Sequence, residues 1–337
     1  MLELDRSRYL AIEAGAVAQA GRIHQTLGEW LAAGADSLFL AGTGGAAILM
    51  HPAAQLLQRR SAFPVFAEIT AELVAGGHRA LGPKSIVVIP SVSGTTKESV
   101  ELIAQCRTVG ARVLSLVGHA DTPLGRDADV ACVNFAEDDT SCENYYIQSL
   151  LVALSLMHHR GEIANYDTML AEFKLLPGLL LAVKDQYLAE AEAYAAKIEN
   201  EPYHLITSAG NCFPQAWYFS MCILEEMQWI RTRPVHAADF FHGPLELVEN
   251  GVSVAIFKGE DAFRPLADRV ENFTRRFTDK TYVLDTANFK LPGLSSETRA
   301  LVSPAVLASA LERLSELLAA RRGHPLTTRR YYKKVPY

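Results

Sequence analysis

Short runs of apolar, β-branched residues alternate along the chain with longer stretches that are apolar at helical spacing. The starts of successive runs are separated by 48 and 27 residues in the first half of the chain, and by 48 and 29 residues in the second half. The matched spacing favours a duplicated α/β domain, each copy a parallel sheet with helices between its strands. The six runs predicted to be buried strands are 38–41, 86–89, 113–117, 204–207, 252–257 and 281–284.

Two long helical stretches join the halves. Residues 145–160 are apolar on most faces and are predicted to be buried, whereas residues 179–200 alternate alanine with charge and are predicted to form an exposed or packing helix. Pro177 and Gly178 are expected to break the preceding helix. We therefore divide the chain into a first domain over residues 1–178, a second over 179–323 and a C-terminal tail over 324–337.

The turn after the second predicted strand carries the most specific polar pattern. The segment Ser91-Val92-Ser93-Gly94-Thr95-Thr96 precedes a predicted helix over residues 100–106. A helix N-terminus offers unpaired N–H groups, Ser and Thr hydroxyls add donors, and Gly94 lets the backbone approach a ligand closely. We interpret the turn as the cradle of a single phosphoryl group, the alternative being an ordinary βα turn with a helix cap. The Walker spacing is absent.

The corresponding turn of the second half is different. There the strand over 252–257 is followed by Lys258-Gly259-Glu260-Asp261, whose acidic pair would repel an anion. We therefore expect one phosphate site per chain, in the first half, with the second half supplying other parts.

Composition and charge narrow the classes of function. With 337 residues, 49% hydrophobic and 21% charged, the chain has an ordinary globular composition of about two domains. The net charge of -6 argues against nucleic acid as the main partner. No apolar run approaches the ~20 residues that span a membrane, and no secretory signal is evident. Five scattered cysteines without a C-x-x-C pair suggest reduced thiols in a cytoplasmic protein and make structural zinc improbable.

Candidate acid–base groups lie in the second half. Glu225 and Glu226 occur in an apolar helical stretch next to Met227 and Trp229, a setting expected to raise a carboxyl pKa toward neutrality. Adjacent helical residues point about 100° apart, so at most one of the two glutamates is expected to face a given pocket. His242 lies in a Phe-Phe-His-Gly-Pro turn. Taken alone, an exposed helical Glu and a structural His are the commoner roles.

These motifs together resemble the sugar isomerase (SIS) domain superfamily, as two SIS domains in tandem over nearly the whole chain. The resemblance implies that each domain is a parallel sheet flanked by helices, a flavodoxin-like three-layer sandwich. The turn at 91–96 is similar to the family's S-x-S-G-x-T loop, which implies phosphate contacts from Ser91, Ser93 and Thr96 around Gly94. The segment Gly42-Thr43-Gly44-Gly45 resembles the glycine-rich first turn that lines the same site.

The resemblance also implies roles for the acid–base candidates. The region 224–246 is similar to the isomerase domain of glucosamine-6-phosphate synthase, which makes Glu226 the residue that transfers a proton between C1 and C2. His242 matches the histidine of that family's H-G-P turn, which reaches the site from a neighbouring subunit and handles the sugar ring. The resemblance therefore implies at least a homodimer with shared active sites.

Two features favour one branch of the superfamily. Synthase-type isomerases carry a lysine where this chain has Ile223. The stretches 225–229 and 240–244 and the tail residues 324–331 look more like the Amadori-product deglycases, which split fructoselysine 6-phosphate or a close relative. That resemblance implies a phosphosugar-amine substrate, no metal or organic cofactor, and a tail that folds over the site or a dimer partner. Asp239 and Glu225 are candidate contacts for the amine half, although an internal salt bridge is the simpler explanation for either.

Two other functions share part of this pattern. A phosphosugar aldose–ketose isomerase, including an aminosugar-phosphate isomerase, would use the same base and the same phosphate turn. A non-catalytic phosphosugar sensor would need the phosphate turn alone, and the combination of Glu226 with His242 argues against it.

Overall fold

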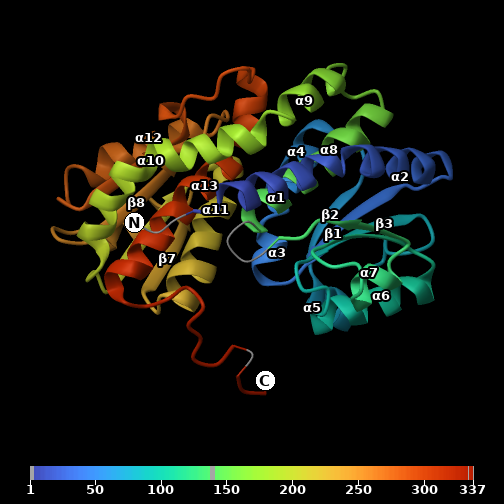
Figure 1. The fold of residues 1–337 in the computed structure, drawn as a ribbon, viewed down its shortest axis with the longest axis horizontal. Coiled ribbons are helices and arrows are strands. Elements are labelled where there is room, and N and C mark those ends of the chain that lie inside the picture. Colours follow the sequence, from blue (N-terminus) through green and yellow to red (C-terminus); the bar gives the residue numbers. More distant parts are fainter. Residues whose placement is uncertain (1–3, 137–140, 333, 337) are drawn as a thin grey trace. The chain divides into compact units, whose positions relative to one another are not determined.

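The computed structural model describes residues 4–136, 141–332 and 334–336. The chain divides into two compact units, which are drawn in Figure 1 and considered one at a time. Residues 6–178 form the N-terminal unit, and residues 179–337 form the C-terminal unit together with residues preceding Arg6.

The N-terminal unit is built on a five-stranded sheet in which every pair of neighbouring strands is parallel. Its strand order, β2-β1-β3-β4-β5, is the flavodoxin-like order, in which the chain reverses direction across the sheet between β1 and β3. Ligands of such sheets bind beyond the carboxyl ends of the strands at this switch point. The strands are β1 (Ser37–Gly42), β2 (Val65–Ile69), β3 (Ser85–Ser91), β4 (Arg112–Val117) and β5 (Val130–Val133).

Helices cover both faces of this sheet. Figure 1 shows α5, α6 and α7 together on one face and α2, α4 and α8 on the other, and the helices within each group contact one another. One apolar core joins Leu102 and Ile103 of α6 to Val87 and Ile89 of β3. The helices are α1 (Arg6–Ala18), α2 (Ala20–Ala32), α3 (Gly44–Ile48), α4 (His51–Arg60), α5 (Thr70–Gly76), α6 (Lys97–Val109), α7 (Pro123–Asp127), α8 (Ser141–His159) and α9 (Tyr166–Phe173).

The C-terminal unit repeats the same topology with four strands. Its sheet is parallel, and the order β7-β6-β8-β9 again places the switch point between the first and third strands of the repeat, here β6 and β8. The strands are β6 (Tyr203–Ser208), β7 (Arg231–His236), β8 (Ser253–Lys258) and β9 (Thr281–Asp285).

The helices of the C-terminal unit also cover both faces of its sheet. Ala267 and Val270 of α12 belong to the same core as Val254 and Ile256 of β8. Phe257 of β8, which points to the opposite face, meets the ring of Phe219 at 5.9 Å. The helical elements are α10 (Leu176–Ile198), η1 (Gly210–Cys212), α11 (Phe213–Tyr218), η2 (Phe219–Met227), η3 (Pro244–Leu247), α12 (Arg264–Thr274), η4 (Thr286–Asn288) and α13 (Ser296–Arg322).

The predicted α/β class with two parallel sheets is confirmed, and all six predicted strands are present. Three strands were not predicted, namely β2, β5 and β7. The preceding helix, α9, ends at Phe173, shortly before Pro177 and Gly178, but these two residues lie in the first turn of α10, which begins at Leu176. Proline is tolerated there because the first turn of a helix has no intrahelical partner for its N–H.

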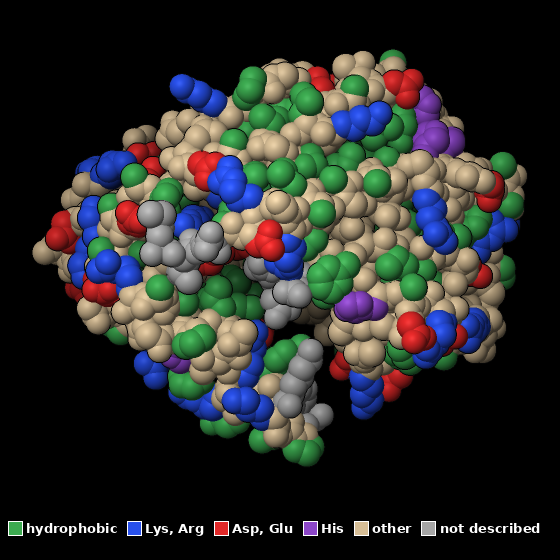
Figure 2. Space-filling view, viewed as in Figure 1, with side chains coloured by type: hydrophobic (Ala, Val, Ile, Leu, Met, Phe, Trp, Pro, Cys, Tyr) green, Lys and Arg blue, Asp and Glu red, His purple; other side chains and the backbone are tan. Residues whose placement is uncertain are grey.

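The surface and the cysteines fit an ordinary globular chain. On the face drawn in Figure 2, Lys and Arg side chains lie interspersed with Asp and Glu over much of the surface. All five cysteines are among the described residues, where each is buried and none forms a disulfide. Over the described ranges, no helix combines the length and apolarity needed to cross a membrane.

A buried histidine in the C-terminal sheet makes a prediction about stability. His204 of β6 is 1% exposed, and its Nδ1 lies 2.7 Å from the Ser253 hydroxyl. Burial lowers the pKa of His204 to about 4. In the unfolded chain His204 takes up a proton near pH 6.5, whereas in the folded chain it does so only near pH 4. The free energy of unfolding therefore decreases as the pH falls from about 6.5 toward 4. The shift corresponds to about 3 kcal/mol of unfolding free energy.

Urea unfolding across this pH range tests the prediction. His204→Asn is expected to be less stable at pH 7 but to lose less stability on acidification than the wild type. The slope with pH is compared with that of His119→Asn, which replaces an exposed histidine. An identical slope in His204→Asn would contradict the assignment.

Candidate active site

The predicted phosphate turn lies at the switch point of the N-terminal sheet. Ser91 is the last residue of β3, and α6 begins at Lys97. The Ser91 hydroxyl lies 3.0 Å from the Thr96 hydroxyl and accepts a hydrogen bond from the Gly94 N–H at 3.1 Å. The Ser93 hydroxyl accepts a bond from the Thr95 hydroxyl at 3.1 Å. The hydroxyls are thus gathered around one short loop, where an anion could exchange for these internal contacts.

Gly94 is required at its position for two independent reasons. Its φ of +62° is in the left-handed region that favours glycine. A Cβ at this position would also lie 2.1 Å from Oγ1 and 2.7 Å from Cβ of Thr122. The Thr122 side chain is fixed, because its hydroxyl accepts from the Gly125 N–H at the start of α7 and donates to the His119 carbonyl. The loop is therefore held against its neighbour at a distance that only glycine permits.

The glycine-rich turn after β1 lies at the same edge of the sheet. Strands β1 and β3 are parallel neighbours, with Leu40 beside Val88, so the turns that follow the two strands begin next to each other. Gly42 packs closely against α3, because a Cβ at this position would lie 2.8 Å from the Ala47 Cα. The Thr43 hydroxyl is buried and has no hydrogen-bond partner within the described ranges. The structure thus brings Gly42, Thr43 and Gly44 to the switch point that also carries the 91–96 loop.

The equivalent turn of the C-terminal unit is closed by its own carboxylate. Asp261 accepts hydrogen bonds from the backbone N–H groups of Asn211 and Phe263, each at 2.9 Å. Gly210 makes room for it, since a Cβ there would lie 2.0 Å from Asp261 Oδ2. Glu260 pairs with Arg299. The N–H groups that could hold a bound anion are therefore already used, which supports the expectation of a phosphate site in the first half only.

Glu225 and Glu226 lie on an unusual helix. The segment η2, which contains both, is a nine-residue π-helix, a conformation that is rare and occurs frequently at functional sites. Its last turn continues the wide spacing, with the Gln228 N–H donating to the Ile223 carbonyl at 3.0 Å. The two carboxylates have different partners. The Thr232 hydroxyl donates to Glu225 at 2.5 Å, and Arg329 Nε pairs with Glu226 Oε1 at 2.8 Å.

The expected apolar setting of Glu226 is wrong. Its side chain is 34% exposed and its partner is a guanidinium from the C-terminal tail. The apolar residues Cys222, Leu224 and Met227 of the same stretch are buried. An adjacent cation favours the ionised form of a carboxylate, the opposite of what an apolar pocket does.

The residue after the π-helix is strained. Trp229 has a φ of +56°, which is an outlier for a bulky side chain and is the only positive φ outside glycine in the described part of the chain. The indole is 41% exposed. It packs edge-on against His324 at 4.6 Å, and the Arg330 guanidinium lies 4.2 Å above its ring. Through Trp229, the turn after the π-helix contacts the C-terminal tail.

These residues surround an open pocket of about 740 Å³ within the C-terminal unit. It combines both glutamates with arginines and aromatic rings from the tail and from β6 and β7. The lining residues are Tyr203, Glu225, Glu226, Trp229, Ile230, Arg231, Thr232, Arg329, Arg330, Tyr331 and Tyr332. Trp229, Thr232 and Arg329 were not predicted as site residues. The sequence signal for Arg329 was the resemblance of tail residues 324–331 to the deglycases, which implies a tail that folds over the site or a dimer partner.

His242 does not line this pocket. It is exposed in the turn between β7 and η3, where its N–H donates to the Asp239 carbonyl at 2.9 Å and Gly243 follows with a φ of +129°. Its side chain is therefore presented to the surface of the unit.

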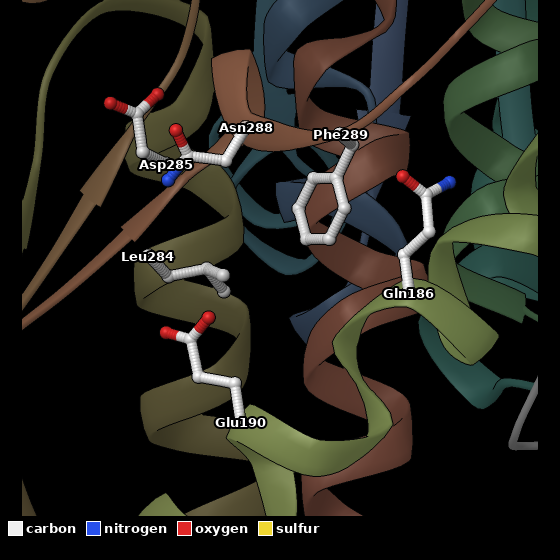
Figure 3. Close-up of a pocket in the computed structure, with 6 residues that line it drawn as sticks. All are labelled: Gln186, Glu190, Leu284, Asp285, Asn288 and Phe289. Carbon is white, nitrogen blue, oxygen red and sulfur yellow. The ribbon is translucent and has the colours of Figure 1, made fainter.

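A second, smaller cavity of about 260 Å³ lies beside β9 and η4 (Figure 3). Gln186 and Glu190 of α10 face the segment from Leu284 to Phe289 across it. Three of its polar side chains have internal partners: Asp285 pairs with Arg264, Glu190 accepts from the Tyr282 hydroxyl at 2.9 Å, and Gln186 bonds the Lys290 backbone. We assign these side chains a structural role.

Comparison with known proteins identifies the class. Residues 32–158, which contain the 91–96 loop, match the sequence model of the SIS domain. The chain is 28% identical over 305 residues to fructosamine deglycase FrlB of Bacillus subtilis, covering 90% of this chain and 93% of the relative. It is 23% identical to fructoselysine 6-phosphate deglycase of Escherichia coli, covering 92% and 89%.

Solved structures agree with the fold. A candidate phosphosugar isomerase from Bacillus subtilis superposes with a TM-score of 0.87 at 27% identity, covering 96% of this chain and 99% of the other. A second one, from Salmonella typhimurium, has the same TM-score and coverage at 28% identity. With relatives of this kind along nearly its full length, the chain is an enzyme.

Proposed function

We propose that the protein is a deglycase for 6-phosphorylated Amadori products of the fructoselysine 6-phosphate type. It would release glucose 6-phosphate and a free amine. The observation that carries this proposal is Glu226, an ion-paired carboxylate facing an open pocket, in a chain similar to named deglycases over about nine-tenths of its length. The SIS domain with its hydroxyl-rich loop supports a phosphosugar as the substrate class.

In this proposal the N-terminal unit holds the phosphate. Ser91, Ser93 and Thr96 donate to the phosphoryl oxygens, and the N-terminus of α6 adds N–H groups and its partial positive charge. Gly42, Thr43 and Gly44 contribute contacts from the neighbouring turn, and the buried Thr43 hydroxyl gains the partner that it lacks in the described ranges. Fixing the phosphate at one end of the sugar positions the reacting carbons.

Glu226 performs the proton transfer. Its carboxylate takes a proton from C1 of the 1-amino-1-deoxy ketose, and the electrons form the double bond of an enaminol. Return of a proton to C2 gives the imine of an aldose. Water then adds to C1 and the amine leaves, which yields glucose 6-phosphate. His242 opens the ring or moves the hydroxyl proton. It acts in a homodimer or higher homo-oligomer, and Glu225 contacts the amine half.

A phosphosugar isomerase is the competing function, favoured by the structural likeness to candidate phosphosugar isomerases. The test is a coupled assay for glucose 6-phosphate with fructoselysine 6-phosphate as substrate, and with fructose 6-phosphate plus ammonia as comparator. We expect glucose 6-phosphate and an equal amount of lysine from the first. Turnover of the comparator alone would assign the chain to the isomerases. Absence of turnover with the lysine compound and with Amadori 6-phosphates of α-amino acids would contradict the proposal.

A further inference from the structure

The C-terminal tail is fastened to the end of the π-helix by several separate contacts. Gln228 Nε2 donates to the His324 carbonyl at 2.8 Å, and the rings of Trp229 and His324 are in contact. Arg330 stacks on the same indole. The lower edge of the molecule in Figure 2, where Figure 1 draws the tail, carries Lys and Arg beside hydrophobic side chains. The tail is therefore attached to the segment that carries Glu226.

Arg329 is the part of the tail that reaches the carboxylate. Its side chain is only 13% exposed, so its charge is less screened than that of a surface arginine. Nε pairs with Glu226, while Nη1 donates to the carbonyls of Leu326 at 2.5 Å and Thr328 at 3.0 Å. Both of those acceptors belong to the tail itself. The guanidinium is thus held in a fixed direction by its own backbone and presents Nε to the carboxylate.

We infer that Arg329 is the positioning residue for Glu226: it holds the carboxylate ionised and aimed, and the tail completes the proton-transfer site by supplying it. The inference rests on the proposed function for its kinetic consequences. A base can accept a proton only in its ionised form, and a neighbouring guanidinium favours that form. A fixed partner also limits the rotation of an otherwise flexible glutamate side chain.

Other charged and titratable groups face Glu226 from each neighbouring element. They are Glu225 and Cys222 on η2, Arg231 on β7, Tyr203 on β6, and Arg330, Tyr331 and Tyr332 on the tail. Burial, together with the two carboxylates, raises the pKa of Cys222 to about 12, so this thiol stays protonated at working pH. Arg329 forms the ion pair with the Glu226 carboxylate, with Nε 2.8 Å from Oε1.

The experiment measures kcat/KM against pH for the wild type, Arg329→Gln and Arg329→Lys. We expect Arg329→Gln to move the acidic limb upward by about one pH unit. Because the carboxylate is no longer held in position, kcat/KM at neutral pH is expected to fall by about tenfold as well. Arg329→Lys keeps the charge without the Nε geometry, so its acidic limb should stay near that of the wild type while its rate falls.

The matched control removes another arginine–glutamate pair of the same unit. Arg321 binds Glu199 at 2.7 Å and does not line the pocket, so Arg321→Gln should leave the profile unchanged. An unmoved acidic limb in Arg329→Gln would overturn the inference. So would a rise in activity, which would make the tail an inhibitory latch instead.

A second readout does not depend on turnover. In protein labelled with ¹³C at the glutamate carboxyl, the Glu226 resonance is identified by its loss in Glu226→Gln, and its titration midpoint is expected to rise in Arg329→Gln. An unchanged midpoint would overturn the inference in a folded variant. Inactivity of the wild type toward all the Amadori 6-phosphates would count against the proposed function, while the titration still decides the role of Arg329.

Discussion

Replacement of Glu226 by glutamine is expected to lower kcat for glucose 6-phosphate release by roughly 10³-fold, with little change in substrate affinity. Glutamine has nearly the same shape but cannot accept the C1 proton, so the chemical step is lost while the phosphate contacts persist. Steady-state kinetics give kcat, and competition by glucose 6-phosphate in single-turnover experiments gives affinity.

The control for this substitution is Glu249→Gln, an exposed glutamate of the same unit outside the pocket, which should behave as the wild type. Because Glu226 pairs with Arg329, the variant also leaves a mostly buried guanidinium without its carboxylate, and a modest loss of stability is expected. Thermal unfolding separates that effect from the kinetic one. Substantial residual turnover in a folded Glu226→Gln protein would contradict the assignment of this residue as the base.

Replacement of Gly94 by alanine should raise the KM for phosphorylated substrates by tenfold or more. The new methyl group cannot fit 2.1 Å from the Thr122 hydroxyl, and a left-handed φ of +62° costs alanine about 1–2 kcal/mol in addition. The loop must shift away from α7, which moves the Ser91, Ser93 and Thr96 hydroxyls out of register with one another. The inhibition constant of glucose 6-phosphate measures the same loss without catalysis.

Gly110 supplies a matched control at the other end of α6. Its φ of +77° is also left-handed, but a Cβ there would meet its nearest neighbour at 3.6 Å, an ordinary contact. Gly110→Ala is therefore expected to lose stability of about 1 kcal/mol while keeping KM. Equal effects of the two substitutions on KM would show that the loop geometry at Gly94 does not serve phosphate binding.

The strands could be predicted where parallel pairing buries both faces. Strands β1, β3 and β8 read as continuous apolar runs because each of their residues is buried. Strand β7 was missed because it is an edge strand with the sequence Arg-Thr-Arg-Pro-Val-His, in which side chains alternate between solvent and the sheet and Pro234 is tolerated only at an edge. Strand β5 was missed because its four residues are too few to show a clear strand pattern.

The candidate site also has a part that could be predicted from the sequence and a part that could not. The 91–96 loop is local, so its residues and their spacing could be read from the sequence. The environment of Glu226 is not local: the π-helix has no distinct apolar period to reveal it, and Arg329 approaches from a tail far away in the sequence. The apolar neighbours of Glu226 in the sequence therefore predicted an apolar environment, whereas in the fold its carboxylate pairs with Arg329.

The central claim is that Glu226 moves a proton from C1 to C2 before the amine leaves. The most direct test uses fructoselysine 6-phosphate that carries deuterium at both C1 positions, with the sugar product followed by NMR. The account predicts glucose 6-phosphate with one deuterium at C1 and the other at C2 or lost to water, formed more slowly than from unlabelled substrate. Release of fructose 6-phosphate that retains both deuterium atoms would mean direct displacement of the amine and would contradict the account.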